Sequence, residues 1–199
     1  SRGLGDVYKR QDQRHAELIV QHLGLSSNSK GVNTPSQQMT NADESPLDAE
    51  HASSYRAQVA RANYLAQDRA DLGFAVKELC RQMSAPRVCD WEKLKRLGRY
   101  LINRTRVVVK YMYQEMPNSL DIWSDTDHAG CLTTRKSTSG GVIMMGGHLI
   151  KSWATTQAII ALSSGEAEFY AIVKCGSVLL GIRNMMADMG IKLKLTIKA

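Results

Sequence analysis

The stretch SDTDHAGCLTTRKSTSGGVIMMGG, from Ser124 to Gly147, and the stretch ALSSGEAEFYA, from Ala161 to Ala171, decide the fold of this chain. The first follows an alternating apolar and polar run, Leu120–Trp123, which predicts a β-strand that ends near Asp125. The second opens a strongly periodic helix that contains Glu168. Together they place one acid at the end of a strand and another at the start of a helix.

The helix contains two glutamates, Glu166 and Glu168, which are two residues apart and therefore lie on different faces. Three- and four-residue steps from Glu168 meet only apolar residues, whereas the same steps from Glu166 meet polar ones such as Asp188. We therefore expect Glu168 to lie where the helix packs on a sheet, near the strand end that carries Asp125. The apolar stripe consists of Ala171, Ile172, Cys175, Leu179, Ile182, Met186 and Met189.

Two carboxylates held close together favour hard divalent cations with oxygen ligands, so Mg²⁺ or Mn²⁺ suits Asp125 and Glu168 better than zinc. The alternative from the residues alone is a capping acid at the strand end and a solvated acid on the helix. Metal-dependent hydrolysis of phosphodiesters is the leading hypothesis, with Asp125 and Glu168 as the catalytic, metal-binding residues.

Several motifs stand in a fixed order around these acids. TRKSTSGG precedes ALSSGEAE, and upstream lie YRAQVARANYLAQDRADLGFAVKELCRQMS, from Tyr55 to Ser84, and DWEKLKRLGRYL, from Asp90 to Leu101. In this order they closely resemble the ribonuclease H domain of copia-type LTR retrotransposon polyproteins, with the segment that joins the reverse transcriptase to it. The resemblance covers roughly Asp12 to Ala199 and is weakest between residues 25 and 54.

The resemblance implies a site in which four acids hold two Mg²⁺ or Mn²⁺ ions and hydrolyse the RNA strand of an RNA/DNA hybrid. Asp125 matches the first acid and Glu168 the second. The third acid follows the next strand, and IKLKLTIKA, from Ile191 to Ala199, alternates as such a strand should. We expect the missing acids beyond Ala199, with Asp at or near the next position of the parent reading frame. The 199-residue chain should then have little or no nuclease activity.

A second candidate site is basic. From Arg87 to Lys110, eight basic residues accompany two acidic ones, which accounts for most of the net charge of +7. Apolar residues at helical spacing between Trp91 and Leu101 predict the buried face of a helix. The residues alone leave open whether the other face binds nucleic-acid phosphates or is an ordinary solvated surface. The cations on or near that face are Lys95, Arg96 and Arg99.

A basic and hydroxyl-rich cluster lies in the loop predicted before the second strand. Such a cluster is suited to phosphate contact, although an exposed turn has the same composition. Its members are Arg135, Lys136, Ser137, Thr138 and Ser139.

The predicted fold class is α/β, or α+β: a ribonuclease H-like mixed sheet truncated after its fourth strand, preceded by a helical segment that resembles the reverse-transcriptase thumb and connection. An antiparallel three-strand meander, a long helix and a further strand should follow one another. Residues 1–11 are expected to be a non-native or disordered leader, 12–54 partly helical and then a mobile linker, 55–113 the helical connection segment, and 114–199 the nuclease-like part. Within the connection segment we expect helices over about residues 54–66 and 68–83.

Composition narrows the other classes. The four cysteines show no CxxC spacing, which argues against zinc and is typical of reduced thiols in an intracellular protein. No apolar run approaches the length of a membrane span. The resemblance implies a location in the cytoplasm, a virus-like particle or the nucleus. It also implies two partners, an RNA/DNA hybrid or nucleic-acid duplex and the upstream reverse-transcriptase part of the same polyprotein.

Two further functions stay open at this point. The first is a non-catalytic, nucleic-acid-binding remnant of a decayed element. The second is a structural spacer that holds a polymerase to its nuclease.

Overall fold

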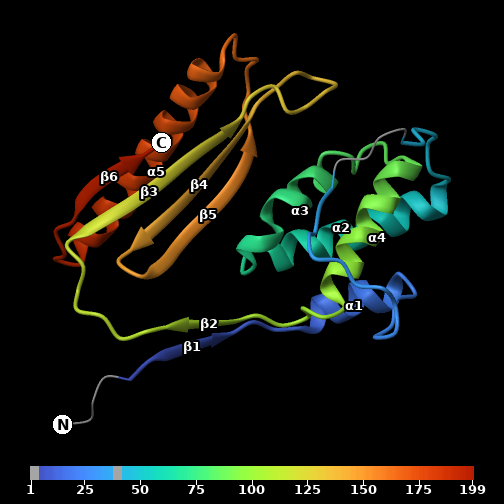
Figure 1. Ribbon diagram of the computed structural model, residues 1–199, viewed down its shortest axis with the longest axis horizontal. Helices are drawn as coiled ribbons and strands as arrows, with labels where there is room; N and C mark the ends of the chain where they lie inside the picture. Colours follow the sequence, from blue (N-terminus) through green and yellow to red (C-terminus); the bar gives the residue numbers. More distant parts are fainter. Residues whose placement is uncertain (1–4, 38–41) are drawn as a thin grey trace. The chain divides into compact units, whose positions relative to one another are not determined.

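The computed structural model describes residues 5–37 and 42–199, so parts of the predicted leader (1–4) and of the predicted linker (38–41) lie outside the described residues. The chain divides into two compact units, Lys9–Val109 and residues 5–8 with Lys110–Ala199 (Figure 1). The division after Val109 falls near the boundary expected after residue 113. Residues 12–54 and most of 55–113 fold together in one unit.

The unit Lys9–Val109 consists of helices that share one apolar core. Leu72 and Leu79, within the predicted helical segment 68–83, are buried in this core. Cys80 and Met83 pack at the edge of the same core. The helices are α1 (Arg14–His22), α2 (Ala49–Ala66), the 3-10 helix η1 (Ala70–Leu72), α3 (Gly73–Cys80) and α4 (Val88–Leu101).

Two helices differ from the prediction in their bounds. α2 begins at Ala49, several residues before the predicted start, because the Asp48 side chain caps it by accepting a hydrogen bond from the His51 N–H at 2.8 Å. The helix predicted over residues 68–83 is divided into η1 and α3. The buried Arg69 stands before η1, and its guanidinium donates to the Asp71 carboxylate at 2.7 Å and to the Arg104 carbonyl at 2.8 Å.

The segment predicted to be a mobile linker makes specific contacts with the start and the face of α4 in its described parts. The Val88 N–H donates to the Ser45 carbonyl at 2.9 Å, and the Arg99 Nε donates to the Lys30 carbonyl at 2.9 Å. Leu23, just before the segment, and Leu25, within it, lie against Gly98, where an added Cβ would come within 2.6 Å of the first of them. The prediction of mobility is therefore wrong for these residues, whose polar composition reflects pairing with α4.

The segment predicted to be a leader contributes a strand. β1 (Val7–Arg10) pairs with β2 (Val108–Tyr111) in a two-stranded ribbon. The backbone contact continues at Gln11, whose N–H donates to the Val107 carbonyl at 3.1 Å. The expectation of a disordered leader is therefore wrong for residues 7–11.

The unit that contains Lys110–Ala199 is a mixed four-stranded sheet with one long helix (Figure 1). Its strands lie in the order β5-β4-β3-β6: the first three in the chain form an antiparallel meander, and β6 is parallel to β3. This is the predicted succession of meander, helix and strand. The turn between β4 and β5 contains Gly146 at φ +60°, a conformation that favours glycine. The elements are β3 (Ser119–Asp127), β4 (Thr138–Met145), β5 (His148–Thr156), α5 (Ser164–Asp188) and β6 (Lys194–Lys198).

The sheet packs one face against α5. Leu120 and Ile122 of β3 are fully buried in a core with Cys175 and Leu179 of the helix. The predicted helical stripe is buried at Ala171, Cys175 and Leu179 and partly buried at Ile172, Ile182 and Met186, while Met189 is exposed. Complete burial of one such apolar side chain contributes about 1.5–3 kcal/mol. The helix is therefore held firmly along its length on the sheet.

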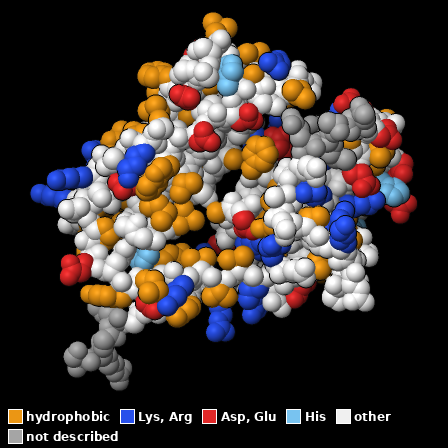
Figure 2. All heavy atoms as spheres, in the orientation of Figure 1, with side chains coloured by type: hydrophobic (Ala, Val, Ile, Leu, Met, Phe, Trp, Pro, Cys, Tyr) orange, Lys and Arg blue, Asp and Glu red, His pale blue; other side chains and the backbone are white. Residues whose placement is uncertain are grey.

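The other face of the sheet is open to solvent. Trp123 and Val142, which pair across β3 and β4, are 42% and 39% exposed. Figure 2 shows hydrophobic side chains on the surface over this sheet. Among the described residues, no helix is long and apolar enough to cross a membrane.

Candidate functional site

Asp125 lies within β3, two residues before the end of the strand. Its side chain is exposed, and one carboxylate oxygen accepts a hydrogen bond from the Thr126 N–H at 2.8 Å. The other oxygen has no protein partner among the described residues. Asp125 therefore presents a free carboxylate oxygen at the surface, as a metal ligand must.

The two glutamates of α5 have different roles in the structure. Ser163 caps the helix by accepting from the Glu166 N–H at 3.1 Å, and Glu166 accepts in turn from the Leu162 N–H at 2.7 Å. Glu166 is thus occupied by the start of the helix. Glu168 is exposed and has no hydrogen-bond or ion-pair partner in the part of the chain that the structure describes. Of the two, Glu168 is the one free to bind a cation.

The position of Glu168 differs in one respect from the prediction. The helix position that is buried against the sheet at this level is Ala167, which is fully buried, and Glu168 lies beside it with an exposed side chain. A charged carboxylate inside an apolar interface would lose its hydration, and a small alanine there avoids that cost.

Hydrogen bonds join the two positions that flank these acids. The Thr126 Oγ1 donates to the Ala167 carbonyl at 3.5 Å, and the Gln157 Nε2 donates to the same carbonyl at 2.8 Å. Asp125 precedes Thr126, and Glu168 follows Ala167. The side chain of the residue after Asp125 therefore contacts the backbone of the residue before Glu168.

The two acids lie on different sides of the sheet. Glu168 belongs to α5, which packs on one face, and the Asp125 side chain leaves the other face. Thr126 points toward α5, because its hydroxyl donates to the Ala167 carbonyl. Ile122 and Leu120, which alternate along the same face of β3, are buried against the helix. Asp125 alternates with them and so leaves the opposite face. The pairing of β6 with β3 extends only to Trp123, opposite Lys198, so the edge of β3 beside Asp125 has no strand partner among the described residues. The structure thus brings the neighbours of the two acids together, while the Asp125 side chain leaves the face of the sheet opposite α5.

Asp127 and the neighbouring loop add no further ligand to the site. Within residues 5–37 and 42–199, no three side chains of Asp, Glu, His or Cys are grouped so as to hold a metal ion. Asp127 folds over the loop that follows, where an added Cβ on Gly130 would overlap its carboxylate. The described candidate ligands are therefore Asp125 and Glu168.

The predicted basic face of α4 contacts other parts of the chain. Lys95 forms an ion pair with Glu92 at 2.8 Å and is 43% exposed. The Arg96 Nη2 donates to the Thr34 hydroxyl at 2.7 Å, and the Arg99 Nε donates to the Lys30 carbonyl. Both guanidinium groups are half-buried against residues 30–37. Arg96 and Arg99 therefore lie near the exposed side of α4, as expected, but each also contacts residues 30–37.

The loop cluster before β4 is also divided by burial. Arg135 is exposed, with φ +54°, and Lys136 is half-buried. Ser137, Thr138 and Ser139 are buried, and the last two belong to β4. The Ser137 Oγ accepts from the Ala129 N–H, and the Ser139 Oγ accepts from the Gln157 Nε2. Only the two basic members remain candidates for direct phosphate contact, because the hydroxyl groups hold the loop together.

Sequence patterns did not indicate two residues that shape the site. Gln157 follows β5 and donates to both Ser139 and Ala167, and Thr126 adds its own contact to Ala167. No periodicity marks a single glutamine at the end of a strand. For Thr126 a signal exists, since a threonine between two acids on an alternating strand must point to the face that they avoid.

Comparisons with known proteins give the family. The chain is 30% identical over 159 residues to an uncharacterized mitochondrial protein of Arabidopsis thaliana, AtMg00810, which covers 80% of the chain and 65% of the relative. It is 33% and 31% identical over 139 residues to the retrovirus-related Pol polyproteins from transposons RE2 and RE1 of the same plant, which covers 70% of the chain.

The chain spans 65% of the length of AtMg00810 and only 10% and 9% of the two polyproteins. No protein-family model matches the chain, and no solved structure gives a significant match. The matched proteins include the Pol polyproteins of several plant transposons, and the chain is also 33% identical over 104 residues to a secreted RxLR effector protein of Plasmopara viticola. The homologues of the chain therefore include copia-type retrotransposon Pol polyproteins, and the chain is similar to a short part of them.

Proposed function

We propose that the chain is the part of a Pol polyprotein in which the ribonuclease H site begins, and that Asp125 and Glu168 are its first two metal-binding acids. In the parent protein this site would hydrolyse the RNA strand of RNA/DNA hybrids. The observation that carries the proposal is the attachment of Thr126 to the Ala167 carbonyl, which holds the neighbours of both acids together.

The donor set fits hard divalent cations. Asp125 offers one carboxylate oxygen that is free of protein hydrogen bonds, and Glu168 offers an unpaired, exposed carboxylate. Oxygen ligands of this kind suit Mg²⁺ and Mn²⁺. Ions bound there would supply an activated water and stabilise the leaving oxygen. Asp125 and Glu168 would position them, while Thr126 and Gln157 would fix the strand and helix that carry the acids.

The strand register supports a third acid beside Asp125. β6 runs parallel to β3 with Lys198 opposite Trp123, so Ala199 is level with Ser124. One further residue in the same register would be level with Asp125, on the same face of the sheet and about 4.8 Å away across the ladder. An Asp at that position of the parent reading frame would close the open edge of β3 with a carboxylate. This agrees with the third acid that the sequence resemblance implies.

Two acids alone do not fix the positions of two ions. The experiment compares this chain with one extended along the parent reading frame, each incubated with a labelled RNA/DNA hybrid and Mg²⁺ or Mn²⁺. The extended chain should cleave the RNA strand, and its Asp125→Asn and Glu168→Gln variants should not. Undiminished cleavage by either variant would disprove the assignment. A folded, extended chain that binds hybrid but never cleaves it would favour the non-catalytic remnant.

A further inference from the structure

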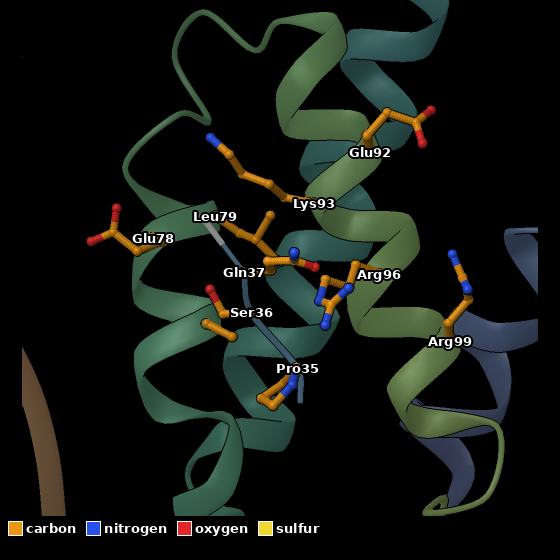
Figure 3. Close-up of a pocket in the computed structure, with 10 residues that line it drawn as sticks. Pro35, Ser36, Gln37, Glu78, Leu79, Glu92, Lys93, Arg96 and Arg99 are labelled. Atoms are coloured by element: carbon orange, nitrogen blue, oxygen red, sulfur yellow. The ribbon is translucent and has the colours of Figure 1, made fainter. Parts of the chain in front are cut away.

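A cavity of about 170 Å³ lies in the helical unit between α3, α4 and residues 35–37. In Figure 3 the Arg96 guanidinium points from α4 toward Ser36 and Gln37, and Arg99 lies one helical turn further along. The cavity is smaller than the roughly 300 Å³ at which pockets for drug-sized ligands begin. It therefore suits a small ion or one end of a larger molecule.

Two of the four cations of α4 are neutralised by carboxylates. Lys93 pairs with Asp90 at 2.8 Å, and Lys95 pairs with Glu92 at 2.8 Å. Burial alone would raise the pKa of Asp90, but hydrogen bonding and the charge of Lys93, with a contribution from Arg87, hold it below its usual value. The positive charges of Lys93 and Lys95 are thus neutralised by carboxylates of the same helix.

Arg96 and Arg99 are different, because neither has a carboxylate partner in the part of the chain that the structure describes. Arg96 carries five N–H donors, and its one acceptor among the described residues is the Thr34 hydroxyl. The Arg96 Nε is buried without a partner among those same residues. Arg99 donates to a backbone carbonyl. Two half-buried positive charges one turn apart repel each other, and unmet donors add a further cost.

The acidic side chains that line the cavity do not neutralise Arg96 or Arg99. Glu78 is paired with Lys77 at 2.6 Å and with Arg81 at 3.3 Å. Glu92 is paired with Lys95. Both carboxylates are therefore neutralised by cations other than Arg96 and Arg99.

We propose that this cavity binds a phosphate group, with the guanidinium groups of Arg96 and Arg99 as its principal ligands and Ser36 and Gln37 as polar neighbours. The planar fork of arginine matches two oxygens of a phosphate, which would satisfy donors that have no partner among residues 5–37 and 42–199. The phosphate can come from a nucleic-acid backbone or from a free nucleotide or ion. The site lies entirely in Lys9–Val109 and does not rest on the proposed metal site in the other unit.

Calorimetric titration of the 199-residue chain with inorganic phosphate and with a 5′-phosphorylated dinucleotide tests this proposal. Saturable one-to-one binding of at least one probe is expected. Arg96→Gln and Arg99→Gln should weaken it about tenfold or more, the loss expected for a hydrogen bond between charged groups. Lys95→Gln is the matched control, since it removes the same charge from the same helix outside the cavity, and it should change affinity less than about twofold.

Competition between the probes identifies the source of the phosphate. Displacement of the dinucleotide by inorganic phosphate indicates a site for a free anion, whereas binding of the dinucleotide alone indicates a backbone phosphate. Arg96→Lys keeps the charge without the fork and should bind more weakly than the wild type even if Arg96→Gln fails to fold. Failure of the folded wild type to bind either probe, or an equal loss with Lys95→Gln, would overturn the proposal. Neither result bears on cleavage, which depends on Asp125 and Glu168.

Discussion

Replacement of Glu166 and of Glu168 by alanine should have opposite consequences, because one acid caps α5 and the other is free. Glu166→Ala removes the carboxylate that accepts from the Leu162 N–H at 2.7 Å. Loss of such a cap costs about 1 kcal/mol, and loss of a negative charge in the first helical turn adds about 0.3–1 kcal/mol. The free energy of unfolding should therefore fall by about 1–2 kcal/mol. A loss of 1 kcal/mol lowers the melting temperature of a unit of about 100 residues by about 4 °C or more.

Glu168→Ala breaks no contact among the described residues, so the free energy of unfolding should change by less than about 0.5 kcal/mol. Urea denaturation measures the free energy of unfolding of both variants. Hydrogen exchange of the peptide that contains residues 161–171 shows whether the change lies at the start of α5. In a chain extended beyond Ala199, Mn²⁺ should raise the melting temperature of the wild type and of Glu166→Ala, but not of Glu168→Ala. The reasoning is refuted if Glu168→Ala destabilises α5 as much as Glu166→Ala does, or if it retains the full Mn²⁺ response.

Three other predictions concern packing, acid stability and the attachment of β3 to α5. Gly141→Ala would place its Cβ 2.2 Å from the Trp153 ring and should cost about 1–3 kcal/mol in urea denaturation, whereas Gly140→Ala, with its nearest contact at 3.8 Å, should cost less. The lowered pKa of Asp90 means that its stabilising contribution is complete above about pH 4 and is lost as the pH falls through the folded-state pKa; Asp90→Asn should therefore flatten the decline in urea midpoint between about pH 5 and pH 2. Gln157→Leu should speed hydrogen exchange at the start of α5, because the Ala167 carbonyl loses its shorter hydrogen bond; unchanged exchange would mean that Thr126 suffices.

The sheet and the long helix were predictable from sequence because their periodicity is set by burial. Alternation on β3 and three- and four-residue spacing on α5 both arise from one face packing on the core, and Ile122 and Leu179 are buried accordingly. Helical spacing selected Glu168 over Glu166 by placing Glu168 where α5 packs on the sheet, but the structure buries Ala167 there and leaves Glu168 exposed. The burial of Ala167 in place of Glu168 was missed because small residues carry a weak periodic signal.

The linker and the basic helix could not be predicted in this way, because their contacts are between polar groups distant in sequence. Arg99 donates to the carbonyl of Lys30, and Arg96 to the hydroxyl of Thr34. Local composition indicates that residues 25–37 are polar and that α4 has a charged face. It does not show that the polar groups of the two segments form hydrogen bonds with each other. Similarly, Thr138 and Ser139 have the composition of a loop and belong to a buried strand, since their hydroxyl groups do not prevent pairing with β3 and β5.

A crystal structure of the extended chain, soaked in Mn²⁺ and measured by anomalous scattering, tests the metal site most directly. The account predicts a Mn²⁺ peak at the open edge of β3, with oxygens of Asp125 and Glu168 about 2.2 Å from the ion and a third carboxylate from the residue after Ala199. Manganese bound elsewhere, or the two carboxylates held apart by the sheet with no ion between them, would contradict it.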